Sequence, residues 1–212
     1  MVAQAKADVY DEIETIELVD SAATRDAVID ALRRIASEAR AGDAVLIYLA
    51  GHGVTSDETG YVFVTVDVTD PATVGSSGLD QATLADLLAE IPAENVMVLL
   101  DTCYAGAFDL KQPANLAQES GYFVLTGSSS VEAALDSYNG ENGVLAFAVK
   151  QGLTGQAASP DGRIDALQLG VYARRTVPEL AAEKNHRQSA VFKAAGGDLK
   201  EFPITTVSKS GG

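Results

Sequence analysis

The stretch that decides the fold is residues 96–106, which read VMVLLDTCYAG. Five apolar residues lead directly into Asp101, Cys103 and Gly106, and Cys103 is the only cysteine of the chain. A continuous apolar run of this length is typical of a buried strand in a parallel sheet. Ligands and catalytic groups collect at the carboxyl ends of such strands. The sequence therefore predicts an α/β sheet that presents the Cys103 thiol at one edge.

A second stretch, residues 44–53, has the same design and reads AVLIYLAGHG. Its apolar run ends at His52, and the flanking Gly51 and Gly53 leave the ring and the adjoining backbone open to a substrate. We therefore expect His52 and Cys103 at the same edge of the same sheet. The alternatives are a cysteine that is only a small buried hydrophobe and a histidine that is incidental to a tight turn. The other histidine, His186, lies in a charged stretch and is expected to be solvated.

Length and charge restrict the classes of function. The chain has 212 residues, 47% of them apolar, which predicts one domain over residues 1–204 and a flexible tail at 205–212. A net charge of −15 argues against nucleic acid and anionic membranes as partners. The apolar runs are shorter than the roughly 20 residues that span a bilayer. The N-terminus has no apolar signal core. We expect a cytoplasmic protein, and the sequence leaves its oligomeric state open.

Hydrophobic periodicity predicts alternating strands and helices with a hairpin between two βαβ units. Thr24 is the expected N-cap of the first helix, Gly42 its end, and Pro178 the point where the last helix is interrupted or ends. Asp67, after the hairpin, is expected to be structural. The predicted strands are 13–19, 44–50, 95–101, 122–126 and 189–193, the hairpin is 54–67, the helices are 24–42, 80–90, 145–153 and 165–182, and 107–121 is a loop.

A cysteine and a histidine at one sheet edge can perform nucleophilic catalysis. Attack on a carbonyl needs a thiolate, a base that later protonates the leaving amine, and donors for the oxyanion. A thiol has a reference pKa of about 8.5, so a neighbouring imidazole makes it useful at neutral pH. His52 precedes Cys103 by 51 positions, and in caspases the histidine lies about 50 residues before the cysteine.

On these residues the chain resembles the caspase-like cysteine peptidases, within them the metacaspase and orthocaspase branch. Residues 48–53 look like the family's histidine motif and residues 101–106 like its Asp-x-Cys-x-x-Gly motif. The resemblance implies a three-layer α/β/α sandwich with a mostly parallel central sheet. It makes Cys103 the nucleophile and His52 the general base and acid, with the N–H groups of Gly53 and Cys103 as the oxyanion hole. The likeness continues through residues 121–136, 143–155 and 188–203.

The resemblance also implies a substrate preference. Asp101 occupies the position where metacaspases carry an aspartate that faces a substrate Arg or Lys, whereas caspases carry glutamine there. A carboxylate in such a pocket favours a cation through hydrogen bonds of roughly 1.5–3 kcal/mol each. We therefore expect protein or peptide substrates with basic residues at the cleavage site. Asp136 matches a further acidic position of the family. Alternatively, Asp101 only caps nearby backbone N–H groups.

The sequence does not decide how the peptidase would be activated. Lys111 lies in the loop after Cys103 and is either a self-cleavage site or a solvated lysine. The chemistry requires no cofactor. Calcium activation is possible in the family, but the chain shows no calcium-loop motif, and no His/Cys cluster predicts a metal site.

The chain departs from the family pattern in two places. It lacks the strand with which chains of the family usually begin. In the family's sheet that strand lies between the two strands expected here at 13–19 and 44–50. Either the chain is part of a longer one, another polypeptide supplies that strand, or the fold has adapted. Ala50 stands where some members have serine. A catalytically inactive scaffold domain is the alternative function. A serine hydrolase is excluded because no Gly-x-Ser-x-Gly turn is present.

Overall fold

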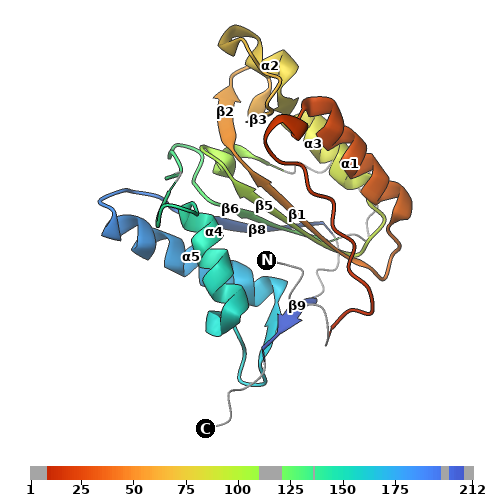
Figure 1. The fold of residues 1–212 in the computed structure, drawn as a ribbon, viewed down its shortest axis with the longest axis vertical. Coiled ribbons are helices and arrows are strands. Elements are labelled where there is room, and N and C mark those ends of the chain that lie inside the picture. Colours follow the sequence, from red (N-terminus) through yellow and green to blue (C-terminus); the bar gives the residue numbers. More distant parts are fainter. Residues whose placement is uncertain (1–8, 110–120, 136, 197–200, 208–212) are drawn as a thin grey trace.

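The structure is a computed structural model, and it describes residues 9–109, 121–135, 137–196 and 201–207. Strands and helices alternate along most of this length (Figure 1). The elements are α1 (Arg25–Glu38), β1 (Ala44–Ala50), β2 (His52–Ser56), β3 (Gly60–Val64), α2 (Val74–Ser77), β4 (Leu79–Asp80), α3 (Gln81–Ala89), β5 (Asn95–Asp101), β6 (Gly121–Thr126), α4 (Val144–Gln151), β7 (Arg163–Asp165), α5 (Ala166–Glu183), β8 (Val191–Gly196) and β9 (Pro203–Thr206), with short 3₁₀ helices at Asp20–Ala22, Pro71–Thr73 and Ala105–Ala107.

The central sheet has four strands in the order β1-β5-β6-β8. β1 and β5 are parallel, with Ala50 opposite Asp101, and β5 and β6 are parallel, with Leu100 opposite Thr126. Only β8 runs antiparallel to its neighbour. The predicted α/β class with a mostly parallel sheet is therefore confirmed, and the carboxyl ends of β1, β5 and β6 meet at one edge.

The side chains of β5 alternate between the two faces of the sheet, because successive residues of a strand point in opposite directions. Val96, Val98 and Leu100 pack in a cluster with α1 and α3, whereas Met97 and Leu99 pack with α4 and α5. All five are buried. Figure 1 shows the two helix pairs on opposite sides of the sheet. The chain thus forms the three layers that the sequence predicts.

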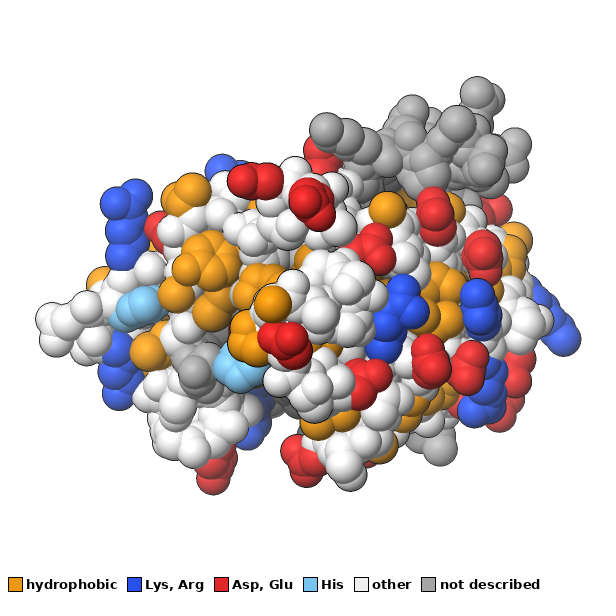
Figure 2. Space-filling model, turned by 90° about the horizontal axis from the view of Figure 1, so that it is seen from above, with side chains coloured by type: hydrophobic (Ala, Val, Ile, Leu, Met, Phe, Trp, Pro, Cys, Tyr) orange, Lys and Arg blue, Asp and Glu red, His pale blue; other side chains and the backbone are white. Residues whose placement is uncertain are grey.

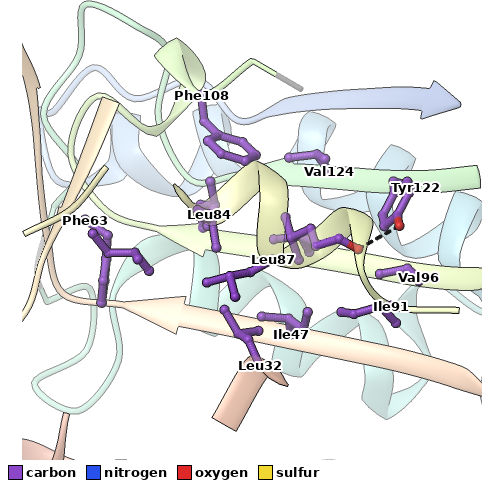
Figure 3. Close-up of a cluster of buried hydrophobic side chains, with 14 of the residues drawn as sticks. Leu32, Ile47, Phe63, Leu84, Leu87, Ile91, Val96, Phe108, Tyr122 and Val124 are labelled. Atoms are coloured by element: carbon purple, nitrogen blue, oxygen red, sulfur yellow. Dashed lines mark hydrogen bonds between the residues drawn. The ribbon is translucent and has the colours of Figure 1, made fainter. Parts of the chain in front are cut away.

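The cluster under α1 and α3 is shown in Figure 3. Leu84 and Leu87 of α3 point toward the sheet, where Ile47 and Val96 face them. Its polar atoms are paired, since the Tyr122 hydroxyl donates to the Leu88 carbonyl at 2.8 Å. This core fixes the strands whose ends carry the site.

Local signals in the sequence predict several helix starts. The Thr24 hydroxyl accepts the Ala27 N–H at 3.3 Å, as expected for the N-cap of α1. Asp67 accepts the Arg25 N–H at 3.0 Å, so its structural role is confirmed. The hairpin after His52 is also confirmed, as β2 and β3. Gly42 does not end α1, which stops at Glu38 because Ala39 is already extended.

The strand predicted at residues 13–19 is wrong. The segment is irregular and ends in the short helix Asp20–Ala22, and Figure 1 shows it as coil. Within the described part of the chain, β1 has no strand partner on its outer side. A groove of about 610 Å³ lies there, lined by Ile13 and Ile16 on one side and Val45 and Leu46 on the other. The first predicted βαβ unit therefore lacks its first strand.

Two predictions about the C-terminal half are also wrong. Pro178 neither interrupts nor ends α5, which runs to Glu183. Val177, Leu180 and Ala181 around it are buried, and this packing outweighs the hydrogen bond that proline cannot make. Thr205, expected in the flexible tail, pairs with Ile164 in β9 and is 7% exposed. Residues 208–212 lie outside the described residues.

Gly170 of α5 is a position where only glycine fits. A Cβ atom there would lie 2.3 Å from the half-buried Phe192 ring, which is stacked on Phe123 and would have to leave this position. We expect Gly170→Ala to lower the free energy of unfolding by about 1–3 kcal/mol, because overpacking outweighs the better helix propensity of alanine. Urea denaturation measures the change. Gly42→Ala, which meets no atom within 4 Å, is the control, and equal stabilities of the two variants would contradict the argument.

Candidate active site

β1 and β5 are neighbouring parallel strands, and His52 and Cys103 follow their carboxyl ends. Ala50 pairs with Asp101, and the Gly51 N–H donates to the Asp101 carbonyl at 3.3 Å. Gly51 has a φ angle of 149°, a conformation that favours glycine, and it turns the chain from β1 into β2. His52 therefore begins β2 directly beside the residues that precede Cys103.

Gly53 packs against the backbone of the cysteine. A Cβ atom on Gly53 would lie 2.5 Å from the Cys103 carbonyl oxygen and 2.7 Å from the Thr102 hydroxyl oxygen. Such distances are not found for real Cβ atoms, so only glycine allows this approach. His52 itself is exposed and Cys103 is half-buried. The structure thus brings Gly53 against Cys103, and His52 precedes Gly53 in the chain.

The turn that carries Cys103 is held firmly. Tyr104 has a left-handed φ of 56°, which is uncommon for a residue with a side chain. The Ser128 hydroxyl accepts the Ala105 N–H at 3.1 Å and donates to the Thr102 carbonyl at 2.9 Å. The hydroxyls of Thr102 and Tyr61 are hydrogen-bonded at 2.7 Å. Burial raises the pKa of Tyr61, which therefore stays protonated as a structural partner of this turn.

The sulfur atom of Cys103 has a backbone partner. The Ala134 N–H donates to Sγ at 3.3 Å, and the Ala134 carbonyl oxygen lies 3.9 Å from the same atom. Ala134 belongs to the loop between β6 and α4. Hydrogen bonds to the charged form of a group favour that form, so this amide can support a thiolate.

Asp101 lies at the end of β5 and faces the N-terminus of α4. One carboxylate oxygen accepts the Tyr48 hydroxyl at 2.8 Å and the Ala146 N–H at 3.1 Å. The N-cap residue of α4, Gly143, has no capping side chain. Asp101, at the end of β5, instead accepts an N–H of the first turn of α4. Desolvation and the charge of Asp101 raise the pKa of Tyr48, which keeps its hydroxyl a donor. These hydrogen bonds hold the Asp101 carboxylate, and the backbone of Asp101 contacts the Gly51 turn that leads to His52.

The other candidates differ in outcome. Asp136 and Lys111 lie outside the described residues. His186 is not simply solvated, because its Nε2 lies 2.9 Å from the Ala133 carbonyl oxygen. Tyr48 and Ser128 contribute to the site although the sequence assigned neither of them a role. Tyr48 is the first residue of the histidine motif, and Ser128 lies in the Gly-Ser turn after a buried strand.

The face that carries the site is seen from above in Figure 2. Histidine side chains lie on it near a group of hydrophobic side chains, in a surface that is elsewhere rich in acidic groups. Among the described residues, no three His, Cys, Asp or Glu side chains are grouped as metal ligands. No helix in the described part of the chain is both long and apolar enough to cross a membrane.

Comparisons with known proteins agree with this architecture. The chain resembles a protein of Geobacter sulfurreducens, GSU0716, with a TM-score of 0.57 and 17% identity over 88% of this chain and 80% of that one. It also resembles caspase-1 of Spodoptera frugiperda, with a TM-score of 0.52 and 12% identity over 89% of this chain and 73% of that one. At these identities the likeness shows the fold alone.

A search of curated proteins found no match. The sequence profile of the caspase domain, peptidase family C14, matches residues 11–200. With the profile spanning most of its length, the chain belongs to the caspase-domain family of peptidases.

Proposed function

We propose that the protein is a cysteine endopeptidase that cleaves peptide bonds after Arg or Lys with a Cys103–His52 dyad. The observation that carries the proposal is the packing of Gly53 on the Cys103 backbone, since a Cβ atom would lie 2.5 Å from the Cys103 carbonyl oxygen. Because His52 precedes Gly53 in the chain, this contact supports a role for His52 beside the cysteine turn. The membership in a peptidase family agrees with the assignment.

The proposed chemistry uses each group in turn. His52 takes the proton of the Cys103 thiol, and Sγ attacks the carbonyl carbon of the scissile peptide bond. The N–H groups of Gly53 and Cys103 stabilise the resulting oxyanion. The C–N bond then breaks, and His52 returns the proton to the leaving amine. Water, deprotonated by the same imidazole, hydrolyses the thioester and releases the second product.

Asp101 is the proposed source of the basic preference. Its carboxylate is fixed by Tyr48 and by the N-terminus of α4, and a fixed charge needs no reorganisation when a substrate cation arrives. A guanidinium or ammonium group near it gains a charge-assisted hydrogen bond. Asp136 is proposed as a second acidic contact. The net charge of −15 also favours basic segments of a substrate.

The cofactor requirement and the mode of activation are proposed together with this function. The reaction needs no cofactor, since thiol and imidazole supply the nucleophile and the base. Self-cleavage after Lys111, carried out by a second copy of the protein, would follow from the preference for basic residues. Calcium activation is tested by adding calcium or a chelator to the peptide assay described next.

Hydrolysis of matched fluorogenic peptides tests the proposal. The purified chain is expected to cleave peptides that end in Arg or Lys and to leave the matched Asp peptide intact. Cleavage after Asp alone would contradict the role of Asp101 but keep the dyad. No cleavage of any peptide by folded protein, with or without calcium, would favour the inactive scaffold.

A further inference from the structure

The loop that contacts the Cys103 sulfur is held from one side by the segment that follows α5. The Leu135 N–H donates to the Gln188 side-chain oxygen at 2.8 Å, and the Ser189 N–H donates to the Glu132 carboxylate at 2.8 Å. These contacts, with that between His186 and the Ala133 carbonyl, fix the neighbours of Ala134 on both sides. Ala134 itself is left to donate to the sulfur.

Gln188 is the central residue of this arrangement. It is 1% exposed, and its Nε2 donates to the Gly127 carbonyl at 2.6 Å. Gly127 in turn donates its N–H to the Leu100 carbonyl of β5 at 2.8 Å. The side chain of Gln188 therefore connects the loop to the strand that carries Cys103. A buried amide whose oxygen and nitrogen are both paired holds a single orientation.

Glu132 provides a second link between loop and cysteine turn. Its backbone carbonyl accepts the Tyr104 N–H at 3.0 Å, one residue after the nucleophile. Burial raises the pKa of the Glu132 carboxyl, but the hydrogen bonds that it accepts, including that from Ser189, outweigh burial and lower it from its ordinary value. The carboxylate is therefore charged at neutral pH, when the enzyme would work.

We propose that the Ala134 N–H is a further catalytic group that supports the Cys103 thiolate, and that Gln188 is the positioning residue that holds this amide at the sulfur. The inference rests on the proposed function only for the role of Cys103 as nucleophile. A hydrogen bond donated to sulfur at 3.3 Å stabilises the anion more than the thiol. It also orients the sulfur before substrate binds.

Alkylation of the protein tests the inference directly, because Cys103 is its only cysteine. The rate of reaction with iodoacetamide is measured by intact mass from pH 5 to 10, for wild type and Gln188→Ala. The variant is expected to react about tenfold more slowly at pH 7, and its profile to move to higher pH. The elements around the cysteine turn carry the titratable groups His52 of β2, Tyr61 of β3, Asp101 of β5, Glu132 of the loop and His186, and all are unchanged in the comparison. The shift along the pH axis separates thiolate support from altered access.

Gln168→Ala is the matched control, because Gln168 also accepts a backbone N–H, that of Asp165 at 3.0 Å, in the N-terminal cap of α5. It is expected to lower stability without moving the alkylation profile. An unchanged profile in folded Gln188→Ala, or an equal shift in both variants, would overturn the inference. If Gln188→Ala does not fold, Ala134→Pro removes the N–H itself, and a wild-type profile in that variant would overturn it. Since alkylation requires no peptide hydrolysis, its result is independent of the proposed specificity and activity.

Discussion

Replacement of Cys103 by serine is expected to lower kcat/KM for an Arg-containing peptide by at least about 10³-fold. The two side chains are similar in shape, and the Ala134 N–H that contacts sulfur at 3.3 Å can donate to oxygen instead. The serine hydroxyl, however, ionises far less readily than a thiol. Steady-state hydrolysis, with the variant purified from a host that contributes no contaminating peptidase, measures the loss.

Two further variants show whether the loss is catalytic. His52→Ala is expected to cause a loss of similar size, and the double variant little more, because members of one catalytic unit are not additive. Thermal unfolding of all three should match that of wild type, since His52 is exposed and Cys103 is half-buried. Activity of Cys103→Ser within tenfold of wild type would contradict the assignment of the nucleophile.

Replacement of Asp101 by asparagine is expected to reduce cleavage after Arg and Lys by about 30- to 100-fold, as is typical when one partner of a buried charge pair is lost. Asparagine keeps an oxygen that accepts the Tyr48 hydroxyl and the Ala146 N–H. The variant therefore removes the charge and leaves the cap of α4 in place. The ratio of kcat/KM for Arg and citrulline peptides measures the contribution of the charge, and it should approach one in the variant.

Asp165→Asn is the matched control for this experiment. Asp165 also caps a helix, α5, by accepting the Gln168 N–H at 2.8 Å, and asparagine is an equally good N-cap. It should leave peptide cleavage unchanged. If Asp101→Asn kept the full preference for Arg over citrulline, the carboxylate would serve only to cap α4.

The sequence predicts the central sheet because its strands are apolar runs, of which β5 is buried from Val96 to Leu100 and β1, at the sheet edge, is only partly buried. The apolar runs at 44–50 and 95–101 have no helical period that competes with a strand. The segment at 13–19 alternates as a strand does, yet it pairs with no strand of the described chain. Alternation specifies two faces, but a strand also needs a neighbouring edge within reach, and local pattern does not contain that information. For the same reason Pro178 misleads, since packing on either side of it decides the helix.

The sequence offers candidate side chains for the site but says nothing of the backbone groups around them. The glycines beside His52 and the acid before Cys103 can be read directly from the sequence. The Ala134 amide has no such signal, because any residue but proline supplies the same N–H, and its loop is hydrogen-bonded to Gln188, 54 residues away along the chain. The role of Asp101 at the start of α4 is hidden likewise, since it joins elements that only the tertiary fold brings together.

The single sulfhydryl at the end of β5 also determines how the protein responds to oxidants. A half-buried cysteine whose sulfur accepts a hydrogen bond from a backbone amide can react with peroxide, which converts it to sulfenic acid. These 212 residues contain no second cysteine to capture that product as an internal disulfide. Recovery must then come from an external reductant such as a small thiol. Without one, oxidation continues to the sulfinic and sulfonic acids, and the loss of the nucleophile becomes permanent.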